Sequence, residues 1–309
     1  MKRWLVSCCV VPIGVATACV GSGGSAGAAA ALCGAASPSA AHYTHVIWIL
    51  EENHSYGKII GNPHARYINT LAHECGLATN YHNISHPSLP NYVGLTSGLR
   101  LSKLRRFSSD CNPSRKCSTS AGSIFGQTSS WKAYEESMPS NCYRKDRGEY
   151  AVRHNPAPYF RRLKTCATHD VPYNRLTKDL ASGKLPAFSF VTPNLIHDMH
   201  DGTVAQGNAW LKSHLPSILD SSEYKSGSTA VFITWDEGEG GTSNNCATNT
   251  QDIGCHVATI IISPTTTPGT KSRKLFNHYS LLRTTEQLLG LPRLGRTKRA
   301  NSMTRAFGL

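Results

Sequence analysis

The stretch TAVFITWDEGEGG, residues 229–241, runs from an apolar segment straight into a cluster of acidic and glycine residues. Its first seven residues are mostly β-branched or aromatic, which is the pattern of a strand that is covered on both faces of a sheet. Asp236 and Glu237 follow where such a strand would end. The stretch therefore predicts a buried strand that carries two carboxylates to the edge of a sheet.

Three further apolar runs have the same character: HVIWIL (45–50), AFSFV (187–191) and VATIIIS (257–263). We interpret all four runs as parallel strands. Helices are expected between and around them, at residues 64–74, after Ser88, at residues 209–219 and at residues 278–291. Strands that alternate with helices predict an α/β fold, with a mostly parallel central sheet and helices on both of its faces.

The first 41 residues differ from the rest of the chain. Two basic residues precede an apolar run at 4–20, and a stretch rich in Gly, Ala and Ser continues to residue 41. This pattern indicates a signal peptide and a flexible segment, and hence a secreted or extracytoplasmic protein. The apolar run is short and is interrupted by proline and glycine, so no transmembrane segment is expected in the mature chain. A lipid anchor at Cys19 is the alternative. The remaining residues, 42–309, are expected to form one domain.

Eleven cysteines are present, and those beyond the leader would enter an oxidising compartment, where thiols pair. We expect the pairs Cys111–Cys117, Cys246–Cys255 and Cys142–Cys166. Cys75 is then left over, or it bonds Cys33 if processing retains that residue. A zinc site is the competing interpretation, but the absence of any CxxC pair favours disulfides.

Residues 100–150 are rich in Ser, Arg, Lys, Gly and Cys and show little periodicity. We interpret them as a disulfide-clipped loop insertion near the mouth of the site. A separate domain is disfavoured because so short a stretch has few apolar residues to bury. The formal net charge of +13 favours an anionic partner, which includes phosphate esters, nucleic acid and acidic surfaces.

Polar residues follow the apolar runs where the strands would end, and ligands of open α/β sheets bind at these ends. Glu51, Glu52 and Asn53 follow the run at 45–50, and Asp236 and Glu237 follow the run at 229–235. The run at 187–191 leads to further candidates: Asn194, His197, Asp198, His200 and Asp201. Carboxylates that converge in one crevice would repel one another, so a divalent cation is expected between them, held by hard oxygen ligands. Glu51 is interpreted as structural or exposed.

Ser88 lies in the segment HPSLPNYVGLTSG, residues 86–98, at the start of an expected helix. Pro87 fixes the entry to the helix, and Pro90 is tolerated in a first turn, where its missing N–H has no partner to lose. A serine hydroxyl here either caps the helix or, next to a metal ion, acts as a nucleophile. Asn91, one turn further on, is a candidate donor to a phosphoryl oxygen.

Five segments in this order resemble the bacterial phosphoesterase family, which contains phospholipases C and secreted acid phosphatases within the alkaline phosphatase superfamily: EENHSYGKIIG, HPSLPNYVGLTSG, FVTPNLIHDMHDG, TWDEGEGG and HYSLLRTTEQLLGLP. The resemblance extends from about His45 to the end of the chain. It implies an alkaline-phosphatase-like α/β fold.

The resemblance also implies residue roles. Ser88 matches the nucleophile, and it shares a metal site with four further matching residues: Glu52, Asn53, Asp236 and Glu237. The last of these is Asp in some relatives and Glu in others. His154 and His200 occupy positions of phosphate-binding or proton-transferring histidines. One divalent ion is implied, and Ca²⁺, Mg²⁺, Mn²⁺ and Zn²⁺ all remain open. The other histidines near these motifs, His197, His256 and His278, are interpreted as structural.

The function expected from this resemblance is that of an acid phosphatase, which hydrolyses phosphate monoesters through a phosphoserine. Phospholipase C members carry a histidine where this chain has Gly238, so a phospholipase C-type phosphodiesterase is the first alternative. The expected partner is a phosphate-ester small molecule or a phospholipid head group. A non-catalytic basic protein that binds polyanions is the second alternative. No specific nucleic-acid binding is expected, since the aromatic and basic interleaving of single-strand binders is missing.

Overall fold

The central strands of the protein run in the same direction, so that their carboxyl ends meet at one edge of the sheet. The computed structural model describes Met1 and residues 32–36, 42–241, 245–249 and 251–309. Within these residues the sheet has nine strands in the order β4-β3-β5-β1-β6-β7-β2-β8, with β9 paired to β2. Their bounds are β1 His45–Glu51, β2 Gly76–His82, β3 Trp131–Glu135, β4 Asp170–Pro172, β5 Phe188–Thr192, β6 Thr229–Trp235, β7 His256–Ile262, β8 Lys271–Ser272 and β9 Phe276–Asn277.

All four apolar runs form strands, and three of them are parallel as predicted. β1 pairs in parallel with both β5 and β6, which makes it the centre of the sheet. The prediction of a parallel strand at 257–263 is wrong, because β7 is antiparallel to β6 and to β2. A parallel return needs a crossover, usually a helix, across one face of the sheet. The described residues between β6 and β7 contain only the 3-10 turn Ile253–Cys255, so the chain returns beside β6 in the opposite direction.

The segment 100–150 is more than a loop insertion, since it supplies β3. This strand lies inside the sheet between β4 and β5, in parallel with both. Trp131 is buried at its start and packs against Phe125, with the two rings tilted and their centroids 4.7 Å apart. The stretch WKAYE has polar residues at two of its five positions, so its sequence did not stand out as a strand.

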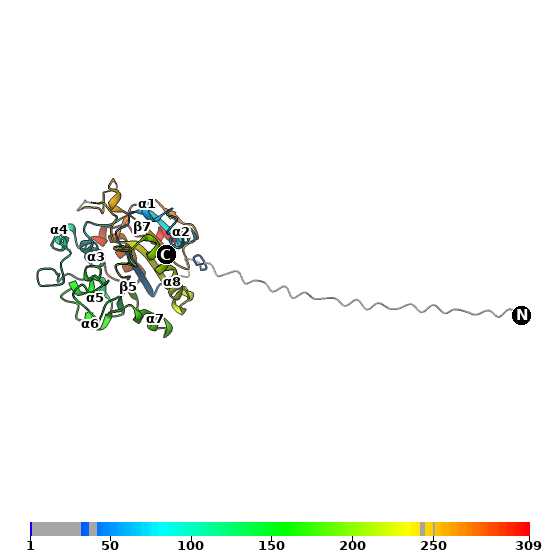
Figure 1. Cartoon of the computed structure of the whole chain (residues 1–309), viewed down its shortest axis with the longest axis horizontal. Coiled ribbons are helices and arrows are strands. Elements are labelled where there is room, and N and C mark those ends of the chain that lie inside the picture. Colours follow the sequence, from blue (N-terminus) through cyan, green and yellow to red (C-terminus); the bar gives the residue numbers. More distant parts are fainter. Residues whose placement is uncertain (2–31, 37–41, 242–244, 250) are drawn as a thin grey trace. The chain divides into compact units, whose positions relative to one another are not determined.

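Helices cover both faces of the sheet (Figure 1). One face carries α2, α7, α8 and α9, of which α2 and α8 pack against each other; the other carries α3, α5 and α10. The helix bounds are α1 Tyr56–Ile59, α2 Arg66–Glu74, α3 Ser88–Ser97, α4 Leu101–Leu104, α5 Ile124–Gln127, α6 Cys166–His169, α7 Asn174–Ala181, α8 Val204–Leu219, α9 Ser222–Lys225, α10 His278–Leu288 and α11 Thr304–Phe307. The four expected helices correspond to α2, α3, α8 and α10.

The packed body starts earlier in the chain than residue 42. Cys33 is fully buried and forms a disulfide with Cys75 at the end of α2. Ala36 donates its N–H to the carbonyl of Pro264 at 2.8 Å. Residues 32–36 therefore belong to the folded part, contrary to the expected boundary. Cys19 and most of the expected leader lie outside the described residues.

The three disulfides expected from the sequence, Cys111–Cys117, Cys142–Cys166 and Cys246–Cys255, are all present. The first two clip the segment around β3, and the third closes the loop between β6 and β7. Among the described residues, no helix is long and apolar enough to span a bilayer.

Candidate active site

The residues that follow β1, β5 and β6 meet at the carboxyl edge of the sheet. Glu51 at the end of β1 is paired with Trp235 at the end of β6, so the residues after them lie side by side. Asp236 donates its N–H to the carbonyl of Glu51 at 2.9 Å. Glu52 donates its N–H to the carbonyl of Asp198 at 2.7 Å, which brings in the segment that follows β5. The three polar clusters singled out in the sequence are thus one site.

Ser88 reaches this site from the first turn of α3. The N-cap position is Pro87, and every residue of α3 is buried. Gly94 allows close packing, since a Cβ there would lie 2.8 Å from Ile84 Cδ1. With the helix fixed in this way, Ser88 Oγ donates a hydrogen bond to Glu52 Oε2 at 3.2 Å. The hydroxyl therefore faces the acidic residues, and no side-chain cap bond is made from the N-cap.

Asn91 ties the same helix to the end of β6. Its Oδ1 accepts hydrogen bonds from the N–H groups of Ile84 and Ser85 at 2.9 and 3.0 Å. Its Nδ2 donates to Glu237 Oε2 at 3.1 Å and to the carbonyl of Ser85 at 2.8 Å. Asn91 thus holds Glu237 in place, and its amide hydrogens are directed at protein oxygens.

Asn53 and Asp236 each carry one side-chain oxygen without a hydrogen-bond partner among the described residues. Asn53 adopts a left-handed backbone conformation with φ of 50°, which asparagine tolerates better than most residues. Its N–H donates to Asp236 Oδ1 at 3.2 Å. Asn53 Oδ1 and Asp236 Oδ2 are both buried without a hydrogen-bond partner among the described residues. Buried polar atoms are normally paired, so these two atoms point to a missing ligand.

The site concentrates negative charge away from water. Burial, together with the charges of Asp236 and Asp198, raises the pKa of Glu52 well above its usual range. Burial and the charge of Glu237 raise the pKa of Asp236 in the same way. Among the described residues, only histidines form ion pairs with Glu52 and Glu237. The donor set of Glu52, Asn53, Ser88, Asp236 and Glu237 consists of hard oxygen atoms and fits a divalent cation.

His154 lies on the opposite side of Glu52 from Ser88 in the hydrogen-bond network. Its Nε2 is 3.4 Å from Glu52 Oε1, and its Nδ1 is 3.1 Å from Asp198 Oδ2. Tyr92 stacks on the His154 ring at 5.4 Å and donates a hydrogen bond to Glu52 Oε1. Burial lowers the pKa of His154 well below its usual value. A carboxylate on Nδ1 fixes the ring so that Nε2 faces the acidic centre.

His200 lies next to His154, with ring centroids 5.5 Å apart. The backbone N–H of His200 donates to Asp198 Oδ1 at 2.8 Å, while Asp198 Oδ2 contacts the ring of His154. One carboxylate therefore contacts both residues. His200 Nδ1 is 2.6 Å from Asp201 Oδ1, and its Nε2 is 3.2 Å from Arg153 Nη2. A guanidinium group only donates hydrogen bonds, so Nε2 acts as the acceptor and Nδ1 carries the proton.

Three residues of this site carry no role in the sequence analysis: Tyr92, Arg153 and His86. His86 pairs its Nδ1 with Glu237 Oε2 at 2.9 Å. Tyr92 lies one turn after Ser88, so it was recognisable as a residue on the same helix. His86 is the first residue of the segment 86–98, and Arg153 directly precedes His154. Their partners in the site, Glu237 and His200, come from distant segments. Asp198, singled out only as one of several strand-end residues, is the carboxylate that positions His154 and His200.

Of the three histidines interpreted as structural, two make their contacts outside the acidic centre and one supports its backbone. His197 pairs with Glu136 at 2.9 Å, and His256 stacks on Tyr56. His278 is fully buried, and its Nε2 bonds the backbone carbonyl of Asp236 at 2.6 Å, so it supports the end of β6.

Glu51 is fully buried rather than exposed, and neither of its carboxylate oxygens has a partner among the described residues. Burial and the charges of Asp198 and Glu136 raise its pKa well above the usual range.

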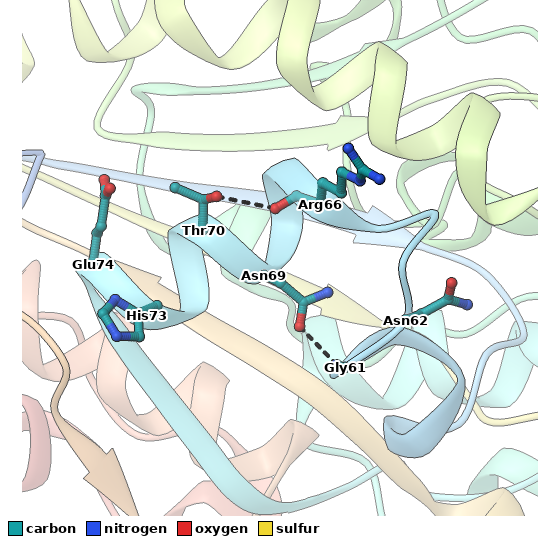
Figure 2. Close-up of a pocket in the computed structure, with 7 residues that line it drawn as sticks. All are labelled: Gly61, Asn62, Arg66, Asn69, Thr70, His73 and Glu74. Carbon is teal, nitrogen blue, oxygen red and sulfur yellow. Dashed lines mark hydrogen bonds between the residues drawn. The ribbon is translucent and has the colours of Figure 1, made fainter.

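A pocket along α2 lies apart from the acidic centre (Figure 2). Its volume is about 500 Å³, and it is lined by Gly61, Asn62, Arg66, Asn69, Thr70, His73 and Glu74. Several of its polar groups are already used locally: Thr70 bonds the carbonyl of Arg66, and Asn69 accepts from Gly61. None of the candidate catalytic residues lines it.

Comparisons of the sequence identify relatives over most of the chain. The Phosphoesterase family profile matches residues 62–292. A phosphatidylinositol-3-phosphatase of Mycobacterium tuberculosis is 32% identical over 268 residues, which are 86% of this chain and 83% of that protein. A phosphate-repressible acid phosphatase of Penicillium chrysogenum is 29% identical over 74% of this chain, and the match spans only 55% of that protein's length.

Solved structures with the same fold are more distant in sequence. A Vibrio parahaemolyticus protein of the alkaline phosphatase superfamily has a TM-score of 0.55 at 15% identity, over 84% of this chain and 71% of that chain. Murine ectonucleotide pyrophosphatase/phosphodiesterase 5 has a TM-score of 0.54 at 9% identity, over 81% of this chain and 96% of that chain. These likenesses confirm the predicted alkaline-phosphatase-like fold. Given this fold, the assembled acidic centre and the profile match across most of its length, the chain belongs to the phosphoesterase family and is a hydrolase of phosphate esters.

Proposed function

We propose that this protein is a metal-dependent phosphatase that hydrolyses phosphate monoesters through a phosphoserine on Ser88. The observation that carries the proposal is the contact between Ser88 Oγ and Glu52 Oε2, 3.2 Å, inside a buried acidic site with unpartnered oxygens. A hydroxyl that served only as a helix cap would bond the backbone of α3 instead.

Five residues would hold the ion: Glu52, Asn53, Ser88, Asp236 and Glu237. When bound, a divalent cation offsets the carboxylate charge and lowers the pKa of the serine hydroxyl. The oxygen ligands allow Ca²⁺, Mg²⁺, Mn²⁺ or Zn²⁺. Asn91 orients Glu237 and lies one turn from Ser88. Its amide is proposed to contact a phosphoryl oxygen as the substrate enters, which requires its bond to Glu237 or to the Ser85 carbonyl to open.

In the first step Ser88 Oγ gives up its proton to solvent and forms a bond to phosphorus, and the bond from phosphorus to the ester oxygen breaks. The departing alkoxide needs a proton, and His200 and His154 are the candidate donors. His200 is the stronger of the two, because burial lowers the pKa of His154 and the Nδ1 of that ring faces Asp198. Asp201, at 2.6 Å from His200 Nδ1, stabilises the charged ring that such a donor requires. Arg153 must then move away from Nε2. In the second step water attacks the phosphoserine, which regenerates Ser88 and releases inorganic phosphate.

The test is a comparison of wild-type protein with Ser88→Ala on 4-nitrophenyl phosphate. We expect a loss of at least about a thousandfold in kcat for this variant, and loss of wild-type activity in EDTA that added metal restores. Ser97→Ala, which removes a buried hydroxyl from the other end of α3, is the matched control and retains activity. An acid-quenched reaction gives a phosphorylated peptide containing Ser88. Undiminished turnover by a folded Ser88→Ala protein would sink the proposal.

A phosphoinositide is the second substrate candidate, since one relative is named phosphatidylinositol-3-phosphatase. Parallel assays on a phosphoinositide monoester, on 4-nitrophenyl phosphate and on bis(4-nitrophenyl) phosphate separate lipid monoester, soluble monoester and diester activity.

We also propose that the protein is secreted. Four disulfides support an oxidising compartment, in which such bonds persist. Detection of the protein in culture medium or in an extracytoplasmic fraction, with residues 32–36 retained, would support this location. Recovery in the cytoplasm with free thiols would contradict it.

A further inference from the structure

A groove of about 300 Å³ opens beside the first turn of α3, the helix that carries Ser88. Its lining comes from residues before, within and after α3, including His86, Pro90, Leu101, Leu104 and Arg105, and from Asn245 in the loop between β6 and β7. His86 also contacts Glu237 Oε2 at 2.9 Å, so the groove adjoins the acidic centre directly. A phosphate ester whose phosphoryl group reaches Ser88 therefore has this groove available for the rest of the molecule.

The segment that carries Arg105 is fixed to the helix that carries Ser88. Leu104 is buried against α3, and a Cβ on Gly94 would lie 2.9 Å from Leu104 Cδ1. Phe107 is fully buried, with its ring edge-on to Tyr159 at 6.2 Å. Arg105 lies between these two anchors, so its backbone position is set by core packing on either side.

A hydrogen bond fixes the far end of the same segment. Asp110 Oδ1 accepts from the N–H of Leu89, the residue after Ser88, at 2.9 Å. The segment that lines the groove is thus bonded to the helix turn that carries Ser88.

The chemistry of the groove combines apolar walls with one cation. Leu101 and Leu104 suit the hydrocarbon or ring part of an alcohol. Within the described part of the chain, no carboxylate forms an ion pair with the Arg105 guanidinium. A guanidinium binds phosphate and carboxylate groups with two parallel hydrogen bonds. The groove therefore complements an alcohol with an apolar body and a second anionic group.

We propose that this groove is the leaving-group subsite and that Arg105 selects phosphate monoesters whose alcohol carries a second phosphate or carboxylate. This inference rests on the proposed function and names the substrate class for the same site. Arg105 acts on binding of the distal anion and has no part in the bond-forming step at Ser88.

The experiment compares two esters that differ only in the distal anion, phenyl phosphate and 4-carboxyphenyl phosphate. For each protein, the ratio of kcat/KM for the carboxylated ester to that for the plain ester is measured. Arg105→Gln is expected to lower this ratio about fivefold, the effect of one solvent-accessible ion pair. Activity on phenyl phosphate stays close to wild type, and 0.5 M salt reduces the wild-type ratio toward that of the variant.

Arg106→Gln is the matched control, because Arg106 is the adjacent exposed arginine and its guanidinium bonds the carbonyl of Lys116 instead of lining the groove. Arg105→Lys keeps the positive charge, so its kcat/KM ratio is expected to lie between those of the wild type and Arg105→Gln. An unchanged ratio in Arg105→Gln, or an equal drop in Arg106→Gln, overturns the inference while the phosphatase activity stands. Absence of all turnover in wild-type protein would instead refute the proposed function.

The second anion has two sources, a soluble bisphosphate and a lipid phosphodiester. Inositol bisphosphate and a phosphatidylinositol phosphate in mixed micelles serve as the two arms. Arg105 sensitivity in both arms indicates recognition of the anion itself, and sensitivity confined to micelles identifies a lipid source. Sensitivity in neither arm counts against the inference.

Discussion

At the scale of single residues, the clearest feature of the site is one carboxylate that positions two histidines. Asp198 accepts from the His200 N–H with one oxygen and contacts His154 Nδ1 with the other. It is buried, and this burial raises its pKa to about 7. Asp198 thus holds the His200 backbone and orients the His154 ring, which would otherwise rotate. Loss of such a carboxylate typically reduces activity without removing any group that touches the substrate.

Asp198→Asn is therefore expected to lower kcat/KM about tenfold or more, since the amide no longer fixes the ring of His154. Steady-state kinetics on 4-nitrophenyl phosphate and the melting temperature are the measurements. Glu136→Gln is the matched control, because it alters a carboxylate on His197 at 2.9 Å, away from the acidic centre. Equal kinetic losses in the two variants would show that Asp198 has only a structural role.

At the scale of elements, the short segment 32–36 is linked to the end of α2 by the Cys33–Cys75 disulfide. The Cys33–Cys75 disulfide links residues 42 apart in the chain, whereas Cys111–Cys117 links residues 6 apart. A longer loop restricts the unfolded chain more strongly, because more conformations are removed when its ends are joined.

Replacing both Cys33 and Cys75 by serine is thus expected to lower the free energy of unfolding by about 4 kcal/mol, against about 2 kcal/mol for the Cys111 and Cys117 pair. Urea unfolding at one pH gives both values. Activity at 25 °C is retained in the first variant, since the bond lies outside the candidate site. If the shorter link proved the more stabilising, the anchoring role of residues 32–36 would be wrong.

For the whole molecule, charge is unevenly distributed. Residues 100–164 contain fourteen Lys and Arg against five Asp and Glu, so much of the net charge of +13 lies in this one segment. The same segment supplies Arg105 in the groove and Arg153 beside His200. At least these two positive charges therefore lie near the acidic centre, where they attract anionic substrates.

Buried acids away from the centre also shape the stability of the whole protein. Asp170 is fully buried, and both of its oxygens accept from Asn155 Nδ2 at 2.9 Å. Burial raises its pKa from 3.8 to about 7. The folded state then binds more protons than the unfolded state between these two values. Its contribution to the free energy of unfolding falls as pH rises through this window.

Asp170→Asn removes this contribution. The variant is expected to gain stability relative to wild type as pH rises from about 4 to about 7, with a constant difference above that. Urea unfolding at four pH values within and above the window measures the trend. Asp220→Asn, which changes an exposed carboxylate paired with Lys225, shows no such trend. A difference that did not vary with pH would contradict the argument.

The sequence by itself determined the α/β class, the three central parallel strands and the strand-end residues that meet in the acidic centre, but not Tyr92, Arg153 and His86. Strands buried on both faces need continuous apolar runs, and chemistry at strand ends leaves polar residues directly after them. It also determined the three local disulfides, whose partners are close in the chain.

Only the tertiary structure decided which way β7 runs, that β3 lies inside the sheet, and that Cys33 belongs to the body. These features depend on contacts between segments far apart in the sequence, for which local patterns carry no signal. The groove is the same kind of feature: Arg105 becomes part of the site because packing of Leu104 and Phe107 places it beside α3.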